Sequence, residues 1–195
     1  MTKGHGFRLV LASASPRRSE LLRNAGIAFA VHPPQVDETR HKQESPIKYA
    51  QRVARDKARA VSKQDPDAIV LGADTIVVVG RDILGKPRDA ADAARMLRRL
   101  SGRPHKVVTA VALIGSNQNK FEDVRAESTK VVFNRLSAAD IRDYVASGEP
   151  MDKAGAYAIQ GRASRWIPKI VGDYCNVVGL PVTLVVQMMK KRGLI

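Results

Sequence analysis

The sequence contains very little cysteine and few aromatic residues. Cys175 is the only cysteine among 195 residues, which excludes an intrachain disulfide and fits a reducing compartment. Aromatic side chains make up 5% of the chain, and no alternation of basic and aromatic residues indicates a stacking platform for single-stranded nucleic acid. These two shortages argue against a disulfide framework and against a single-strand binding module.

Long apolar runs are absent as well. No segment approaches the roughly 18 consecutive apolar residues that a membrane span needs. The apolar run near the N-terminus is too short for a secretory signal, and Arg17 and Arg18 follow it at once. We therefore expect a cytoplasmic protein without a membrane partner.

Acidic residues are scarce relative to basic ones. The chain has 19 Asp and Glu against 33 Lys and Arg, a formal net charge of +14. This charge predicts an anionic partner or substrate but does not choose among nucleic acid, a membrane surface and a small phosphate compound. With 44% hydrophobic and 27% charged residues, we expect one globular domain over residues 1–195, with room for two lobes.

A strand, a turn of small hydroxyl residues and a helix follow one another near the N-terminus. Ser15 suits the N-cap position and Pro16 the first helical position. The first amides of a helix favour negative charge, and Ser13, Ser15, Arg17 and Arg18 add hydroxyl and guanidinium donors beside them. The unit therefore suits a polyphosphate, although an ordinary capped helix with solvated arginines has the same pattern.

A carboxylate lies inside the most apolar stretch of the chain. Residues 68–79 are rich in valine and isoleucine and predict the central strand of a sheet, yet Asp74 and Thr75 lie within them. Burying an unpaired carboxylate costs several kcal/mol, so Asp74 is expected to pair or to bind a cation. We interpret Asp74 as a functional residue.

Three further polar residues are candidates with ordinary alternatives. Glu38 belongs to a polar loop in which acids are usually solvated, and Lys57 lies on a predicted helix, where a snorkelling lysine is the commoner case. A turn at residues 80–82 returns the chain through a short strand to Lys86, which places Lys86 near the strand of Asp74.

The other elements follow from hydrophobic periodicity and from breakers. We expect strands over 27–31, 107–114, 124–133 and 164–171, helices beginning at 46, 90, 138 and 181, and a glycine-rich loop over 149–161. The strands 107–114 and 124–133 are predicted to form an antiparallel pair. The apolar positions of the helix from 46 are Ile47, Ala50, Val53, Ala54, Ala58 and Val61.

Several motifs occur together in a characteristic order. They are L-A-S-A-S-P-R-R-S-E-L-L, D-E-T, D-K-A, G-A-D-T, G-K-P, D-K-A-G-A-Y, I-Q-G and V-G-L-P, from Leu9 to the final helix. This combination resembles the Maf family of nucleotide pyrophosphatases. The resemblance implies an α/β fold (mixed α+β), an elongated central mixed sheet flanked by helices with a cleft between two lobes, similar to inosine triphosphate pyrophosphatases.

The resemblance also implies a reaction and a set of roles. A nucleoside triphosphate is hydrolysed between the α and β phosphates with a divalent cation, Mg²⁺ or Mn²⁺, and the enzyme is expected to be a homodimer. Asp74 matches the catalytic base, and Lys86 and Glu38 are expected to act with it in catalysis. We expect Glu38 and Asp74 to hold the cation. The other residues that match the phosphate and metal shell are Ser13, Arg18, Lys57 and Lys86.

Three positions indicate the branch of the family. Arg17, Thr75 and Gln160 resemble the branch that acts on dTTP and UTP, whereas the 7-methyl-GTP branch carries an aromatic residue, glutamine and glutamate there. Two other functions are also compatible with the sequence. One is the same chemistry on 7-methyl-GTP or inosine triphosphate, and the other is a non-catalytic regulator that binds nucleic acid or a cell-division protein.

Overall fold

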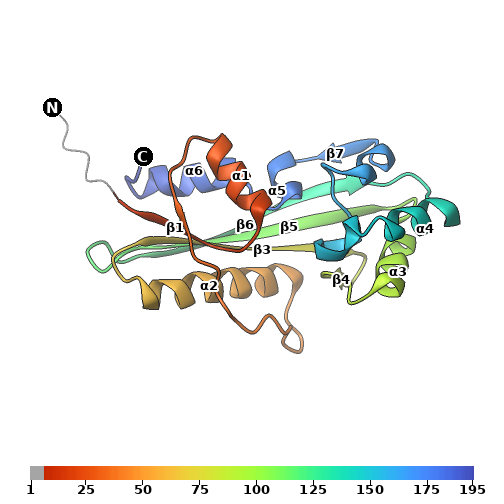
Figure 1. Ribbon diagram of the computed structural model, residues 1–195. Coiled ribbons are helices and arrows are strands. Elements are labelled where there is room, and N and C mark those ends of the chain that lie inside the picture. Colours follow the sequence, from red (N-terminus) through yellow and green to blue (C-terminus); the bar gives the residue numbers. More distant parts are fainter. Residues whose placement is uncertain (1–6) are drawn as a thin grey trace. The chain divides into compact units, whose positions relative to one another are not determined.

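The computed structural model describes residues 7–195, which form a mixed α/β fold (Figure 1). The strands are β1 (Leu9–Ala12), β2 (Ala30–Val31), β3 (Ile69–Val79), β4 (Asp82–Leu84), β5 (Pro104–Ile114), β6 (Glu122–Val132) and β7 (Lys169–Val171). The helices are α1 (Pro16–Asn24), α2 (Pro46–Gln64), α3 (Ala90–Leu100), α4 (Ala138–Ala146), α5 (Tyr174–Val178) and α6 (Val182–Lys191). Three short 3₁₀ helices are η1 (Glu149–Asp152), η2 (Ala154–Ala156) and η3 (Arg162–Trp166).

The seven strands form one mixed sheet. Their order is β2-β1-β3-β5-β6-β7, and β4 pairs with β3 off this path. β1 runs parallel to both β2 and β3, whereas β4 is antiparallel to β3 and β7 is antiparallel to β6. The predicted mixed α/β class is confirmed, and β5 and β6 are neighbours as expected.

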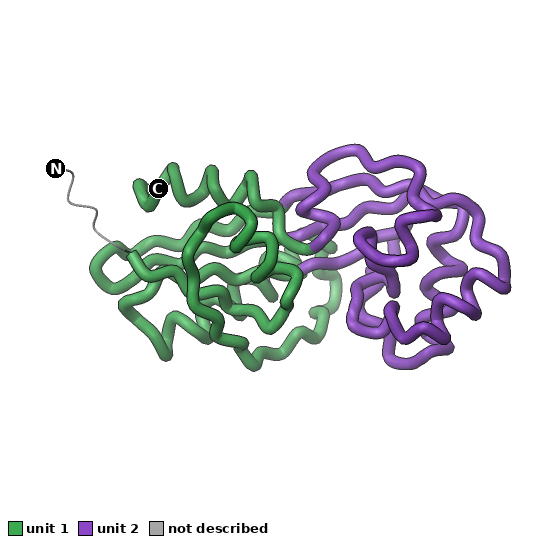
Figure 2. The backbone as a smooth tube through the Cα atoms, turned by 45° about the horizontal axis from the view of Figure 1, so that its top comes forward, with its two compact units in different colours: residues 1–74, 110–126, 179–195 green, residues 75–109, 127–178 purple. Residues whose placement is uncertain are grey.

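The chain divides into two compact units (Figure 2). Unit 1 contains the described residues up to 74 together with 110–126 and 179–195, and unit 2 contains 75–109 and 127–178. Strands β3, β5 and β6 contribute residues to both units. The single domain over 1–195 stays a prediction.

Unit 1 is built on the βαβ arrangement of β1, α1 and β2. Alternate residues of β1 and β3, among them Leu11 and Leu71, pack with Leu22 of α1 and Met188 of α6 in one hydrophobic cluster. Figure 1 shows α1 and α6 on one side of the sheet and α2 on the other. The intervening residues of β3 therefore face α2.

Helix α2 begins as the sequence predicts. Ser45 is its N-cap and accepts a hydrogen bond from the Lys48 backbone. The buried residues are Ala50, Val53, Ala54, Ala58 and Val61, which confirms the predicted apolar face. Ile47 was assigned to that face wrongly: it is 48% exposed, because it lies in the first turn, ahead of the first buried residue.

Unit 2 has its own core between helices α3 and α4 and its part of the sheet. Asp89 caps α3 through the Asp92 backbone, and Ser137 and Asp140 form a reciprocal capping box at α4. The buried aromatic residues of this core are Phe133, Tyr144, Tyr157 and Trp166. The predicted starts of both helices are confirmed.

Three element predictions are wrong in part. The strand expected over 27–31 is limited to Ala30–Val31, and the strand expected over 164–171 is limited to Lys169–Val171. The residues before β7 form η3 instead, because Trp166 turns inward and packs edge-to-face on Tyr144 with ring centroids 5.2 Å apart. The loop expected over 149–161 contains η1 and η2.

Within residues 7–195, the helices are all too short or too polar to span a bilayer. The expectation of a cytoplasmic protein stays a prediction.

Candidate functional site

The turn after β1 lies beside the buried part of β3. Ala12 pairs in register with Gly72, so the turn begins at Ser13 close to the level of Asp74. Ser13 is 5% exposed, and its Oγ accepts hydrogen bonds from the Ser15 backbone at 3.2 Å and from Arg18 Nη1 at 3.0 Å. These two bonds use both lone pairs of the hydroxyl. Ser13 is therefore left as a hydrogen-bond donor toward any ligand.

Ser15 occupies the predicted N-cap position of α1, with Pro16 following. The predicted N-cap is therefore confirmed, although the Ser15 side chain forms no capping bond to a described residue. The Ser15 backbone N–H donates to Ser13 Oγ, so the Ser13 side chain organises the turn.

Arg18 connects this turn to the start of the C-terminal helix. Its Nε donates to the Gly179 carbonyl at 2.9 Å. Burial lowers the pKa of Arg18, while the negative charges of Asp74 and Glu38 act to raise it. Arg18 therefore lies within electrostatic reach of both carboxylates that the sequence singled out.

Helix α2 approaches β3 unusually closely at Gly72. A Cβ atom at this position would lie 2.2 Å from the Ala54 carbonyl oxygen and 2.9 Å from the Ala58 Cβ, distances that no side chain tolerates. Gly72 of the G-A-D-T motif and Ala58 of the D-K-A motif therefore lie against each other. This contact sets the distance between the α2 residues and the next inward-facing residue of β3, Asp74.

Lys57 uses this proximity to contact two carboxylates. Its Nζ lies 2.9 Å from Asp74 Oδ1 and 3.0 Å from Glu38 Oε1. The Lys57 and Asp74 side chains are 11% and 9% exposed, whereas that of Glu38 is 53% exposed. Asp74 is paired, as its burial predicts, and the reading of Lys57 as a solvated surface lysine is wrong.

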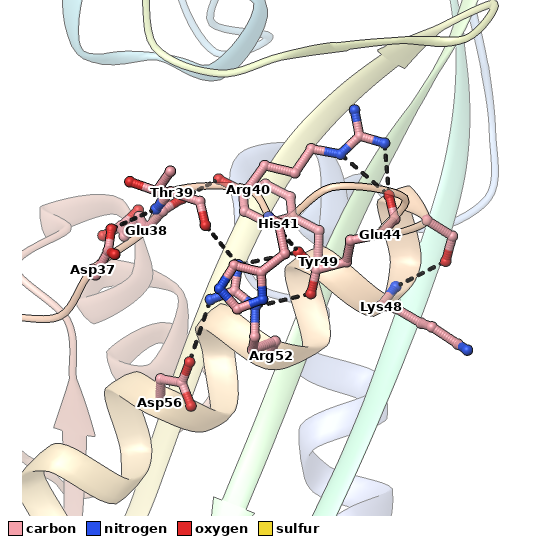
Figure 3. A network of polar contacts seen from close by, with 11 residues as sticks. Asp37, Glu38, Thr39, Arg40, His41, Glu44, Lys48, Tyr49, Arg52 and Asp56 are labelled. Atoms are coloured by element: carbon pink, nitrogen blue, oxygen red, sulfur yellow. Dashed lines mark hydrogen bonds and ion pairs between the residues drawn. The ribbon is translucent and has the colours of Figure 1, made fainter.

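A polar network holds the loop that carries Glu38 (Figure 3). Tyr49 donates its hydroxyl hydrogen to the Glu38 carbonyl at 2.8 Å. Arg52 donates to the Thr39 carbonyl at 2.9 Å and forms a two-pronged ion pair with Glu44, Nε–Oε1 2.8 Å and Nη2–Oε2 3.1 Å. Tyr49 and Arg52 are not recognisable as site residues from the sequence, because each looks like an ordinary polar residue of an amphipathic helix.

Arg17 lies on α1 in unit 1 and is half-buried, whereas Thr75, Lys86 and Gln160 belong to unit 2. Thr75 Oγ1 lies 3.0 Å from Thr109 Oγ1, and since it follows Asp74 in an extended strand the two side chains leave β3 on opposite faces. Lys86 is exposed in the loop after β4, and Gln160 is exposed in the turn before η3. Their approach to a substrate stays a prediction.

Two acidic residues of the site could contribute to the binding of a divalent cation. Among the described residues no group of three or more His, Cys, Asp or Glu side chains is arranged to hold an ion by itself. Glu38 and Asp74 offer two hard carboxylates around the same lysine. Such a pair fits Mg²⁺, which keeps several waters and binds one or two carboxylates together with substrate phosphates.

The chain is similar to known proteins over most of its length. The sequence profile of the family described as Maf-like protein matches residues 8–192. A protein of Koribacter versatilis named dTTP/UTP pyrophosphatase is 55% identical over 190 residues, 97% of each chain. One of the same name from Symbiobacterium thermophilum is 56% identical over 186 residues, 95% of this chain and 94% of its own.

A solved structure shows the same fold at lower sequence identity. The Ham1 protein of Staphylococcus aureus matches with a TM-score of 0.52 and 14% identity, over 94% of this chain and 98% of its own. This likeness supports the mixed α/β fold that the sequence predicted.

Proposed function

The chain belongs to the Maf family, and from this premise we propose that it hydrolyses dTTP and UTP to the nucleoside monophosphate and pyrophosphate. The relatives named above carry the substrate assignment. The observation that carries the chemistry is the buried Asp74, held by Lys57 beside Glu38. A buried carboxylate that shares a lysine with a second carboxylate is an arrangement that occurs preferentially at functional sites.

In this proposal, unit 1 supplies the groups that bind the triphosphate. The outward amides of α1, the Ser13 hydroxyl, the Ser15 turn and the charge of Arg18 face the phosphate oxygens. Ser13 is suited to this role because its two lone pairs are already used by the protein. Lys86 adds a further positive charge to the phosphate shell.

Asp74 orients the attacking water and takes its proton. Water adds to the α-phosphorus, the bond to the α–β bridging oxygen breaks, and pyrophosphate leaves with that oxygen. Lys57 keeps the Asp74 carboxylate in one position through its 2.9 Å contact. Glu38 and Asp74 would hold a divalent cation, Mg²⁺ or Mn²⁺, which when bound neutralises phosphate charge and acidifies water.

Arg17, Thr75 and Gln160 select the base in this proposal. Gln160 offers both a donor and an acceptor, which a pyrimidine edge can use. A homodimer is part of the same proposal.

A nucleotide panel tests the proposal. The purified protein is incubated with dTTP, UTP, CTP, ATP, GTP, inosine triphosphate and 7-methyl-GTP, with Mg²⁺ or with EDTA, and both phosphate products are quantified. We expect dTTP and UTP to react fastest, with one pyrophosphate per monophosphate and a requirement for the cation. Release of orthophosphate, a preference for another base, or no hydrolysis would each contradict it.

A further inference from the structure

We propose that Tyr49 and Arg52 are positioning residues that hold the Glu38 carboxylate against Lys57. The inference deepens the proposed function and rests on it for the role of Glu38. These two residues explain how the half-exposed Glu38 side chain, on an irregular segment, keeps one position.

The need for such residues follows from where Glu38 lies. The segment from 32 to 45, between β2 and α2, has no strand or helix, and the Glu38 side chain is 53% exposed. A loop of this kind samples many conformations unless side chains fix its backbone, since ordering each residue costs about 1–2 kcal/mol. The single contact with Lys57 at 3.0 Å is too little to order it.

Tyr49 fixes Glu38 directly. Its hydroxyl donates to the Glu38 backbone carbonyl at 2.8 Å. The phenol hydrogen is the only donor of this side chain. The bond therefore ties the Tyr49 side chain to the backbone of the residue that carries the carboxylate.

Arg52 fixes the two ends of the stretch 39–44. Its guanidinium binds the Glu44 carboxylate through two nitrogens and also donates to the Thr39 carbonyl. Charge-assisted, two-pronged bonds of this kind are the strongest that side chains form in proteins. Glu44 in turn accepts from the His41 backbone at 3.2 Å, and Arg40 donates to the Glu44 carbonyl at 3.2 Å through Nε and 2.6 Å through Nη2. Arg52 is the residue that ties this stretch to α2.

Helix α2 supplies the frame for all three groups. Tyr49, Arg52 and Lys57 follow at spacings of three and five residues on α2, and Gly72 seats this helix on β3. The same rigid element therefore places Lys57 against Asp74 and holds the backbone on which Glu38 is carried. The position of Glu38 is therefore determined by contacts from α2 rather than by the conformation of its own loop.

The test compares Arg52→Lys and Tyr49→Phe with a matched control on the same helix. Arg59 forms an equivalent two-pronged pair with Glu122, Nε–Oε2 2.8 Å and Nη2–Oε1 3.1 Å, away from the Glu38 loop. Arg59→Lys therefore removes the same kind of interaction without touching Glu38. The first measurement is amide hydrogen exchange over residues 37–44 in the full chain.

We expect Arg52→Lys to speed exchange of the His41 amide about tenfold or more, because Glu44 is released. Arg59→Lys should leave this segment unchanged. Equal exchange in the two variants would overturn the proposal, and it does so whether or not the protein hydrolyses nucleotides. Failure of the proposed function is seen separately, as a lack of pyrophosphate release by the wild type.

The second measurement is kinetic. Arg52→Lys and Tyr49→Phe should each lower kcat about tenfold with a smaller change in KM, since misplacing a group by about an ångström has effects of this order or larger. In a Glu38→Gln background the same substitutions should have no further effect on kcat, because they act only through Glu38. If the substitutions instead act by a general loss of stability, their losses of kcat add to that of Glu38→Gln in the double variants. Additive losses of this kind would overturn the positioning role.

Discussion

Lys57 Nζ lies 2.9 Å from Asp74 Oδ1 and joins helix α2 to the central strand β3. Both side chains are about nine-tenths buried, so neither charge is well solvated. Removing one partner of such a pair typically costs about 3–5 kcal/mol, because the other is left uncompensated. The pair is therefore a structural joint as well as the centre of the proposed active site, and the variants below separate the two roles.

Asp74→Asn tests the catalytic role while keeping the shape of the side chain. The amide oxygen can still accept from Lys57, but the group no longer takes a proton from water. We expect pyrophosphate release to fall by about 10³-fold, with nucleotide binding retained in calorimetry and a folded protein in thermal melts. Asp82→Asn, at an exposed pair with Arg99, is the control and should keep full activity. Normal turnover by Asp74→Asn would remove the basis of the mechanism.

Gly72→Ala tests the close contact that seats α2 on β3. The new methyl group meets the Ala54 carbonyl oxygen and the Ala58 side chain, and overpacking of this kind destabilises by about 1–3 kcal/mol or more. Urea unfolding should report the loss. Gly85→Ala is the matched control, since a Cβ there meets nothing within 4 Å. Equal stabilities of the two variants would show that α2 is free to move away.

His105 predicts a pH dependence of stability. It is 3% exposed, its Nε2 lies 2.8 Å from the Tyr157 hydroxyl, and burial lowers its pKa to about 4. The unfolded chain, with a histidine pKa near 6.5, binds the proton more readily, so stability falls as the pH drops from about 6.5 toward 4. The full effect is roughly 3 kcal/mol.

His105→Gln isolates this contribution from the carboxylates. Asp37, Glu44, Asp92 and Asp140 all have lowered pKa values, and their stabilisation is lost at lower pH in both proteins. The difference in unfolding free energy between wild type and variant should therefore change between pH 6.5 and 4 and level off below. Parallel curves over this range would exclude a buried neutral His105.

The specificity proposal is tested by exchanging three residues together. Arg17→Trp, Thr75→Gln and Gln160→Glu introduce the residues that resemble the 7-methyl-GTP branch. We expect the ratio of kcat/KM for 7-methyl-GTP over UTP to rise by about 10²-fold, the order that one or two good polar contacts provide. Asn117→Asp, in the turn between β5 and β6, controls for an added negative charge. An unchanged ratio would reject the specificity assignment and leave the catalytic one intact.

Much of the site was predictable from local patterns. The Ser13 turn, the strand containing Asp74 and the starts of α2, α3 and α4 follow from residue periodicity, proline and capping signals within a few positions of each other. The segment before β7 was not, because Trp166 is drawn into the aromatic core of unit 2 and overrides an extended pattern. Nor were the roles of Tyr49 and Arg52 predictable, because their hydrogen-bond partners lie in a loop whose sequence has no periodic pattern.

The sequence by itself determined that a carboxylate would be buried in the central strand. The apolar residues on both sides of Asp74 identify a buried strand, and burial in turn requires that the carboxylate be paired. Only the tertiary structure decided which basic side chain pairs with that carboxylate. Lys57 and Asp74 are joined because Gly72 lets two alanines of α2 reach the strand. Such a contact depends on the packing of surfaces distant in the chain, for which no local pattern exists.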